Sequence, residues 1–411
     1  MLKNIALLGV SQFVNIGIPL MLLPFLAGKF TPEVFGYYAQ LISLTQFFVV
    51  IIDLGFNVGA IRDAVPFVNN KKGMGVFIEK ILARKLTLIL IFIPIYILIV
   101  YLRFPNALIG SCLLSFAIVI GSALLPQWYY QVTGKLNSII LYQIIAKLAG
   151  LLFVYFFVSS DDDFLLLVFG QNLPILFVGV LFYWKLKKIF ELKIIGLISI
   201  REVVAHYKKN GDMFWGLLCM TLYNSANVFF IGYMLPASEI GKYFIAEKLI
   251  RGIQSVYGVA SSVIYMKATK ISSDIDRLID FNKKMGFIFF PIALIIVAVV
   301  FLWADGLIYY LFENKYPESF QVMKIFALLA PIIVVSNILG MQLMLPLGMD
   351  RLFRNSIFVG VAINFILLPW LTLEYGVLGS AVANIIVEIA VMCSMFFYLH
   401  IKIKEVKCIK K

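Results

Sequence analysis

Twelve long apolar stretches fill nearly all of this 411-residue chain, and they decide which solvent it can fold in. Each is at least about 17 residues long, enough for an α-helix to cross the hydrocarbon core of a bilayer. Because lipid offers no hydrogen bonds to the backbone, these stretches must be helices. The mean hydropathy of +0.98 is too high for a soluble protein of this size. The predicted spans are 5–28, 35–60, 86–102, 107–130, 138–158, 164–184, 213–235, 240–266, 285–304, 320–346, 355–373 and 376–399.

The positive charges predict the orientation of the spans, because Lys and Arg collect on the cytoplasmic side of a membrane. When the connections are assigned alternately to two sides, one side receives 27 of the 35 cations and the other receives three. The larger group includes a cluster from Arg62 to Lys85 and the basic tail. The acidic run Asp161 to Asp163 falls on the opposite side. We therefore expect an even number of spans with both termini in the cytoplasm.

The longest connection divides the predicted spans into six and six. We expect an all-α membrane protein with an N-terminal six-helix lobe at 1–184 and a C-terminal lobe at 213–399. A basic cytoplasmic linker at 185–212 joins the lobes, and a basic tail follows at 400–411. In this arrangement the two lobes surround a central cavity.

Composition also excludes several classes of protein. The net charge of +13 reflects the orientation of the spans, so we expect no nucleic-acid partner. The four cysteines show no CxxC spacing and no cluster with histidine, which argues against a metal site. A phosphate-binding GxxxxGK[ST] loop is absent from the sequence. We expect no cofactor and no enzymatic activity.

The most informative residues are charges inside the spans, because a charge at the bilayer centre costs about 2.5–3.5 kcal/mol on insertion scales. Lys248 and Arg251 lie about 12 and 17 Å along the span that begins near Ile240. Their i,i+3 spacing puts both cations on one helix face. Glu247 is placed at i,i+4 to Arg251 and can pair with it.

Lys147 is a third deep cation, in the other half of the chain. Two readings stay open for this set. In one, Glu247 neutralises Arg251, while Lys147 finds a carboxylate or reaches the interface. In the other, Lys147, Lys248 and Arg251 meet in the central cavity and bind an anion that crosses the membrane, such as a pyrophosphate.

Carboxylates and amides within the spans provide further candidates. Glu388, Asp53 and Glu247 are candidates for ion coupling, because a protonatable carboxylate inside the membrane often serves this purpose. A salt bridge to a deep cation is the alternative for Glu388. Three amides could contact sugar hydroxyls, although hydrogen bonds between helices explain them equally well. These amides are Asn15, Asn224 and Asn227.

Short motifs in the chain resemble bacterial polysaccharide flippases of the Wzx type, which belong to the multidrug/oligosaccharidyl-lipid/polysaccharide transporter superfamily. The motifs are Gly36-Tyr37-Tyr38, DLGFNVGAIR at 53–62, PQWYYQ at 126–131 and YGVLGSA at 375–381. The chain departs from the family pattern at Asn57, Gly59 and Ile61. The resemblance implies twelve helices in two six-helix lobes around a central cavity.

The resemblance implies a flippase in the bacterial inner membrane. Its substrate would be an undecaprenyl-pyrophosphate-linked oligosaccharide, an O-antigen-like repeat unit, moved from the inner to the outer leaflet by alternating access. Proton or sodium coupling, as in an antiporter, could drive it, and a polysaccharide polymerase and chain-length regulator could be partners. One alternative is a cation-coupled exporter of drugs or metabolites, with more acidic than basic residues in its cavity. A second is a membrane-embedded glycosyl polymerase or ligase, which needs a catalytic cluster on the outer face, where Asp305, Glu313, Lys315 and Glu318 gather.

Overall fold

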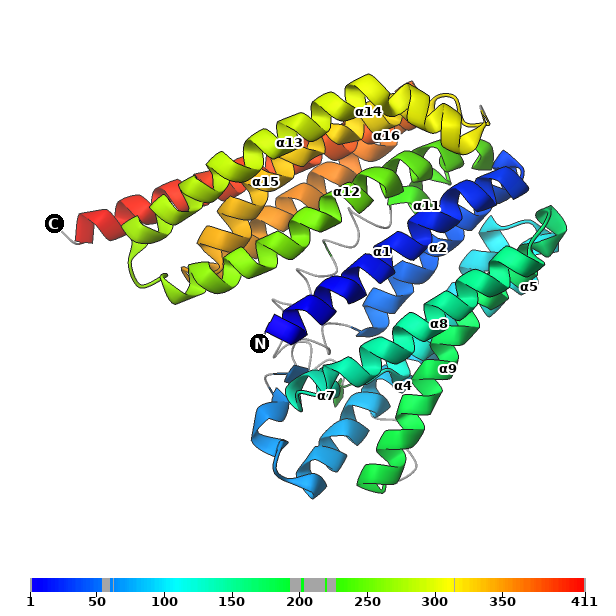
Figure 1. The fold of residues 1–411 in the computed structure, drawn as a ribbon, viewed down its shortest axis with the longest axis horizontal. Coiled ribbons are helices and arrows are strands. Elements are labelled where there is room, and N and C mark those ends of the chain that lie inside the picture. The colour runs from blue at the N-terminus through cyan, green and yellow to red at the C-terminus, as the bar shows by residue number, and fades with distance from the viewer. Residues whose placement is uncertain are drawn as a thin grey trace. The chain divides into compact units, whose positions relative to one another are not determined.

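The computed structural model describes residues 2–53, 60–61, 63–192, 201–202, 219, 227–313 and 315–409, and all regular secondary structure in these ranges is helical. The chain separates into two compact units, Met1–Thr221 and Leu222–Lys411, each of which is described by itself. The first unit contains α1 (Leu2–Lys29), α2 (Pro32–Asp53), α4 (Lys71–Arg103), α5 (Ile109–Leu114), α6 (Ala117–Leu124), α7 (Gln127–Val132), α8 (Leu136–Phe157) and α9 (Phe164–Phe190) (Figure 1). The second contains α11 (Asn227–Ile231), α12 (Ala237–Lys270), α13 (Ile275–Phe312), α14 (Ser319–Ala327), α15 (Leu329–Leu339) and α16 (Asp350–Ile409), with a π-helical turn at Gly340–Met344.

Eight segments of the described chain are long and apolar enough to cross a membrane. The strongest evidence that they face lipid is their exposure. In Ile275–Phe312, only 11% of the most apolar stretch is buried inside the protein. Large exposed apolar surfaces of this kind are not found on monomeric soluble proteins. These segments are Pro32–Asp53, Lys71–Arg103, Asn106–Val132, Leu136–Phe157, Asp161–Phe190, Ile275–Phe312, Ser319–Met344 and Asp350–Lys404.

Each predicted span except 213–235 coincides for most of its length with described helix, but several boundaries differ from those that hydropathy predicts. In the span predicted at 35–60, residues 54–59 lie outside the described residues. Most of 213–235 lies outside the described residues, and only α11 represents it. The span predicted at 86–102 begins earlier, because α4 starts at Lys71, where the Asn70 side chain accepts a hydrogen bond from the Gly73 amide at 2.9 Å. The span predicted at 107–130 is divided into α5, α6 and α7, and Pro126 separates the last two. The count of twelve and the orientation of the termini stay predictions.

Close contacts between small residues hold the helices of the first unit together. A Cβ atom on Gly179 of α9 would overlap the carbonyl oxygen of Gly121 in α6. A Cβ atom on Gly150 of α8 would overlap the carbonyl oxygen of Gly170 in α9 in the same way. Apolar burial drives helix association weakly within lipid, so close backbone approach of this kind supplies much of the packing energy.

One end of the first unit is fixed by an acidic side chain. The carboxylate of Asp161, just before α9, accepts hydrogen bonds from the backbone amide of Thr31 at 2.8 Å and from its hydroxyl at 2.7 Å. Thr31 directly precedes α2, so this contact satisfies an unpaired donor at the start of that helix. Part of the acidic run seen in the sequence therefore caps a helix.

In the second unit, α16 is two antiparallel helices that meet at Gly376. This residue has φ 59° and ψ −140°, a conformation that is open almost only to glycine. Thr372 and Ser380 flank the turn, and their hydroxyl oxygens are 2.9 Å apart. Further along, the hydroxyls of Ser356 and Ser394 are 3.2 Å apart, so the two arms stay in contact over most of their length. The spans predicted at 355–373 and 376–399 are these two arms.

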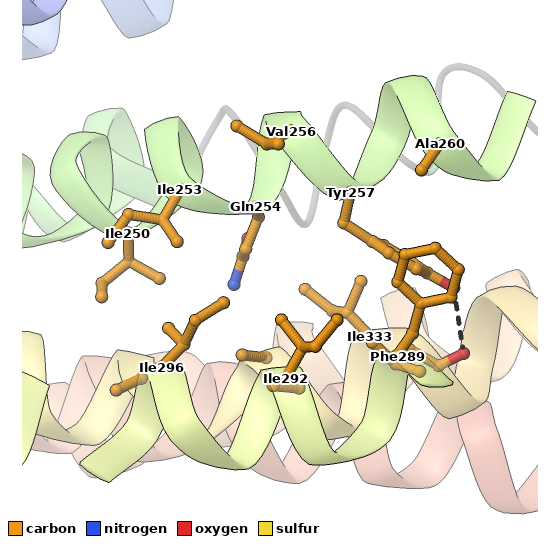
Figure 2. Close-up of a pocket in the computed structure, with 14 residues that line it drawn as sticks. Ile250, Ile253, Gln254, Val256, Tyr257, Ala260, Phe289, Ile292, Ile296 and Ile333 are labelled. Carbon is orange, nitrogen blue, oxygen red and sulfur yellow. Dashed lines mark hydrogen bonds between the residues drawn. The ribbon is translucent and has the colours of Figure 1, made fainter. Parts of the chain in front are cut away.

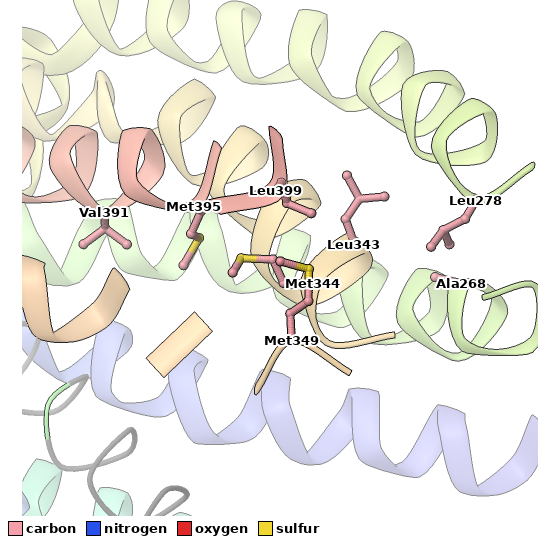
Figure 3. Packing of buried hydrophobic residues seen from close by; sticks show 8 residues of the cluster. All are labelled: Ala268, Leu278, Leu343, Met344, Met349, Val391, Met395 and Leu399. Atoms are coloured by element: carbon pink, nitrogen blue, oxygen red, sulfur yellow. The ribbon is translucent and has the colours of Figure 1, made fainter. Parts of the chain in front are cut away.

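A methionine-rich cluster closes one end of the second unit, where the turn between α12 and α13 meets the second arm of α16 (Figure 3). Met344 is fully buried there, and Met349 and Met395 are almost so. Flexible thioether side chains fill irregular gaps, as this junction requires. The buried members are Ala268, Leu278, Leu343, Met344, Met349, Val391, Met395 and Leu399.

The hairpin in α16 leads to a prediction for Gly379. The carbonyl oxygen of Leu371 lies where a Cβ atom on Gly379 would be placed, so Gly379→Ala forces the two arms apart. We expect this substitution to lower the free energy of unfolding by about 1–3 kcal/mol, the usual cost of overpacking. The thermal melting of the purified protein in detergent measures this loss.

The matched control for this prediction is Gly306→Ala in α13. A Cβ atom on Gly306 meets no atom within 4 Å. Alanine favours helix more than glycine does, so Gly306→Ala is expected to leave the melting temperature unchanged or to raise it. Equal melting temperatures for the two variants would contradict the close approach of Leu371 and Gly379.

Candidate functional site

The candidate site of the second unit is built around an ion pair on α12. The Nε atom of Arg251 donates a hydrogen bond to Oε1 of Glu247 at 2.8 Å. The spacing is i,i+4, as the sequence predicts for this pair. The Glu247 side chain is 3% exposed, whereas that of Arg251 is 35% exposed. The second carboxylate oxygen of Glu247 is buried and has no hydrogen-bond partner among the described residues.

Lys248 occupies a different environment from Arg251. Its ammonium lies 4.9 Å from the centre of the Phe244 ring, one turn earlier on the same helix. A cation over an aromatic face is stabilised by the negative charge of the ring. Lys248 is half-buried, and it is not among the residues that line the cavity beside Arg251. The two cations that the sequence pairs on one face therefore have separate contacts within this unit.

A narrow cavity lies beside the ion pair, with room for about one water molecule. Glu388 of α16 faces this cavity, is almost buried, and interacts electrostatically with Arg251. The charged lining therefore consists of two carboxylates and one guanidinium. A ligand anion at Arg251 would compete with these carboxylates for the guanidinium. The lining residues are Glu247, Ile250, Arg251, Gln254, Phe326, Leu329, Ile333, Asn384 and Glu388.

A buried polar network connects this cavity to α11. The Tyr243 hydroxyl on α12 is completely buried, and it accepts a hydrogen bond from the Asn384 amide at 3.3 Å. It also shares a hydrogen bond with the side chain of Asn227. Asn364 in turn donates to the Asn227 carbonyl oxygen at 2.9 Å. Asn384 is one turn before Glu388, so the network ends at the wall of the cavity.

Sequence reasoning identified part of this network only. It selected Asn227 as a polar residue within a span. It did not select Tyr243 or Asn364. A count of all amide side chains within the predicted spans would have found Asn364. Tyr243 has no distinguishing signal, because tyrosine is common in this chain.

The network predicts that Tyr243→Phe is more harmful than the loss of one hydroxyl suggests. The substitution leaves the amide groups of Asn384 and Asn227 buried without their shared partner. An unsatisfied buried polar group costs about 1–3 kcal/mol. We expect a lower melting temperature for the purified variant. Tyr309→Phe is the control, because Tyr309 is largely exposed on α13, and it is expected to melt like the wild type. Identical melting of all three proteins would contradict the network.

The remaining candidates lie in the first unit or beyond the described residues. Lys147 is half-buried in the middle of α8. Because it belongs to the first unit and Arg251 to the second, the meeting of these cations stays a prediction. Asn224 lies outside the described residues, and only the helical position of Asn15 is described.

Asp53 is part of an ion pair that the sequence did not reveal. Its carboxylate accepts a hydrogen bond from Lys85 of α4 at 2.7 Å. The charge count only places Lys85 among the cations of the cytoplasmic side, and it gives no sign of this pair. The Lys85 side chain is 2% exposed, because α4 carries it into the packed interior beside the end of α2.

Two of the acidic residues near the predicted outer face form ion pairs with lysines of other helices. Glu318 forms an ion pair with Lys242 at 2.8 Å, and Asp305 forms another with Lys324 at 3.0 Å. Each pair joins two neighbouring helices. Lys242 and Lys324, two cations near the ends of spans, therefore have a structural role in joining helices.

Comparisons with known proteins agree with this architecture. A family model described as "Polysaccharide biosynthesis protein" matches residues 1–265. A protein of Shigella dysenteriae named "Putative O-antigen transporter" is 21% identical over 401 residues, which cover 96% of this chain and 99% of that protein. A protein of the same name from Escherichia coli (strain K12) is 22% identical and covers 97% of this chain and 96% of its own length.

Solved structures show the same fold at low sequence identity. An inward-facing multidrug resistance MATE family transporter of the MOP superfamily superimposes with a TM-score of 0.66 at 14% identity, over 96% of this chain and 95% of the other. The lipid II flippase MurJ, in an inward closed conformation, gives a TM-score of 0.55 at 15% identity, over 95% and 80%.

These proteins are named as transporters or flippases, and none of those described above is named as an enzyme. The apolar segments and the bacterial relatives identify a multi-pass protein of the inner membrane. Because the matching family model extends over well more than half of its length, the chain belongs to the polysaccharide biosynthesis protein family.

Proposed function

We propose that this protein is a flippase that moves an undecaprenyl-pyrophosphate-linked oligosaccharide, an O-antigen-like repeat unit, from the inner to the outer leaflet by alternating access. Its bacterial relatives, named as O-antigen transporters, and the shared fold of the lipid II flippase MurJ support this proposal. The family to which the chain belongs is described as "Polysaccharide biosynthesis protein". A polysaccharide polymerase and a chain-length regulator are the partners that such a flippase would serve.

The observation that carries the proposal is the ion pair of Arg251 with Glu247. Both residues are on α12, and the pair lies beside the polar cavity. A guanidinium binds phosphate oxygens in the same forked geometry that it uses for carboxylates. A diphosphate that enters the cavity would replace Glu247 or Glu388 as the partner of Arg251. The site would then exchange one charge-assisted contact for another, and the guanidinium would keep a partner throughout the transport cycle.

A flipping assay tests this function directly. The purified protein is placed in liposomes that carry a fluorescent undecaprenyl-pyrophosphate-linked oligosaccharide, and an impermeant quencher reports the lipid in the outer leaflet. We expect the protein to accelerate the exchange of this lipid between leaflets, and to leave a labelled phosphatidylglycerol unaffected. Exchange at the rate of protein-free liposomes would contradict the proposal.

We further propose that Glu388 couples transport to a proton or sodium gradient. Its carboxylate faces the cavity, and it interacts with the same guanidinium that would bind the substrate. Binding of a diphosphate at Arg251 and binding of a cation at Glu388 would therefore influence one another. Substrate binding and ion binding would thus be linked through one side chain.

This coupling predicts that Glu388→Gln removes the effect of a gradient on flipping. With one coupled proton, a gradient of about one pH unit shifts the ratio of lipid between leaflets about tenfold in the wild type. The variant is expected to reach the same ratio with and without a gradient, while it still exchanges lipid. Sodium gradients are tested in parallel. A gradient response in Glu388→Gln equal to that of the wild type would exclude Glu388 as the coupling group.

The composition of the cavity favours a second candidate function, a cation-coupled exporter of drugs or metabolites. Two carboxylates against one guanidinium give the acidic excess expected for a cationic substrate. An efflux assay separates the candidates. The exporter predicts resistance to cationic drugs when the protein is expressed in a hypersensitive strain, whereas the flippase predicts no change in resistance.

A further inference from the structure

A larger, almost entirely apolar cavity lies next to the polar one in the second unit. It is formed where α12 faces α13 and α15, and it has a volume of about 810 Å³, counting the part that is open to the surface. Figure 2 shows Ile253 and Tyr257 of α12 on one side, and Phe289, Ile292 and Ile296 of α13 on the other. Since the walls consist of aliphatic and aromatic side chains, they suit a hydrocarbon and offer few partners to a polar ligand.

The apolar and polar cavities are adjacent and share part of their walls. Ile250, Gln254 and Ile333 line both of them. A molecule that spans the shared wall would therefore present one end to Arg251 and Glu388, and the other end to Tyr257 and Phe289. The required ligand is amphipathic, with an anionic group joined directly to an apolar chain.

Gln254 supplies a polar contact at this boundary. Its side-chain nitrogen is buried and has no hydrogen-bond partner in the part of the chain that the structure describes. In Figure 2 this nitrogen points into the space between α12 and α13. A buried amide without an acceptor costs about 1–3 kcal/mol, so an oxygen atom of a ligand would be stabilised there. The donor is one turn from Arg251, where a phosphate group bound to the guanidinium would lie within its reach.

The apolar cavity is open to the surface of the unit. Val256 and Ile292 line it, and they are 73% and 46% exposed. A long chain could thus enter the cavity with one segment while its remainder stays outside the cavity. A sealed cavity could not accept part of a chain that is much longer than the cavity itself.

We propose that this apolar cavity binds the part of the polyprenyl chain that follows the diphosphate of the substrate. This inference rests on the proposed function and extends it to the lipid. Arg251 and Gln254 hold the diphosphate end, and the walls around Tyr257 and Phe289 hold the first isoprene units. A chain bound in this way gives the protein a means to distinguish its substrate from a free diphosphate. Affinity must then increase with the length of the chain, because each added methylene or methyl group buries apolar surface.

Binding measurements on the full-length protein in nanodiscs test this inference. The probes are inorganic pyrophosphate, farnesyl diphosphate and undecaprenyl diphosphate. In the wild type, we expect affinity to rise from the first probe to the second by at least about tenfold, and not to fall for the third. Ala260→Phe places a ring in the cavity from α12. The variant is expected to bind the two diphosphates that carry a chain about tenfold more weakly than the wild type does. Its affinity for pyrophosphate is expected to be unchanged.

The matched control is Ala298→Phe, because Ala298 is exposed on α13 and does not line either cavity. It is expected to bind all three probes like the wild type. The melting temperature of each variant shows that it is folded. Equal affinity of the wild type for the three probes, or equal chain dependence in Ala260→Phe and the wild type, would overturn the inference and leave the proposed function intact.

Two further probes separate the inference from the function on which it rests. If pyrophosphate does not bind the wild type, the anion site fails. Binding of undecaprenol that Ala260→Phe removes would then still support a chain site. Phosphatidylglycerol tests the alternative source of a hydrocarbon chain. If it displaces undecaprenyl diphosphate at equal concentration, the cavity holds lipid chains in general and the inference is wrong.

Discussion

Alanine at position 251 is expected to abolish the export of surface polysaccharide and to destabilise the protein at the same time. Arg251→Ala removes the partner of Glu247, whose side chain is 3% exposed, and leaves a carboxylate buried without a counter-ion. Breaking a buried ion pair in this way costs about 3–5 kcal/mol. The loss of export in this variant alone would therefore not distinguish a binding role from a structural one.

A second variant separates these roles. Glu247→Gln combined with Arg251→Gln removes both charges, and retains two amides that can hydrogen-bond at the same i,i+4 spacing. We expect the double variant to recover most of the lost melting temperature and to remain inactive in the flipping assay. Lys324→Ala, which removes a cation from an exposed ion pair with Asp305, is the matched control, and it should export normally.

Recovery of export by the double variant would contradict the role of Arg251 in binding the diphosphate. The same series addresses Lys248, which the sequence pairs with Arg251 at one site. Lys248→Ala removes a cation that rests on the Phe244 ring and has no place in the cavity lining. A loss of export equal to that of the double variant, with normal stability, would show that Lys248 contacts the substrate in another state of the cycle.

Asp53→Ala is expected to be the most destabilising substitution in the first unit. It leaves the Lys85 ammonium, which is almost completely buried, without the carboxylate that lies 2.7 Å away. We expect a loss of about 3–5 kcal/mol, seen as a lower melting temperature and less protein in the membrane. Asp280→Ala is the control. Its carboxylate is exposed and lies 3.9 Å from the exposed Lys283, a contact expected to contribute about 0–1 kcal/mol.

The double variant Asp53→Leu with Lys85→Met decides what this pair does. It replaces both charges with apolar side chains, a change that is often neutral or stabilising in a protein interior. If Asp53 has only a structural role, the double variant melts normally and responds to ion gradients like the wild type. If Asp53 couples an ion, as the sequence also allows, the variant is stable but no longer responds. A stable Asp53→Ala variant would contradict the buried pair itself.

Local periodicity predicted those features that depend only on the helix itself. The spans follow from the thickness of the bilayer, and the contact of Glu247 with Arg251 follows from their i,i+4 spacing. The turn between the arms of α16 lies at Gly376, the first residue of the span predicted at 376–399. Each of these features is fixed by residues that are neighbours along the chain.

Features that depend on distant contacts could not be predicted in this way. The charge count gave only the predicted membrane side of Lys85, and its burial becomes clear only from its contact with Asp53 on another helix. Tyr243 and Asn384 are 141 residues apart, and no spacing in the sequence indicates that they meet. The π-helical turn at Gly340–Met344 lies within a stretch that hydropathy assigns to one continuous span. The candidate site therefore required the structure, whereas the membrane fold did not.

The hairpin at Gly376 restricts which parts of the second unit can move independently. The two arms are joined without a flexible connection, and the contacts of Gly379 with Leu371 and of Ser356 with Ser394 hold them together. Asn364, Asn384 and Glu388 are therefore carried on one rigid body. Any motion that opens or closes the polar cavity must come from α12 and its neighbours sliding against this body. The carboxylate of Glu388 thus acts as a fixed reference point, and it is Arg251 that approaches it or withdraws.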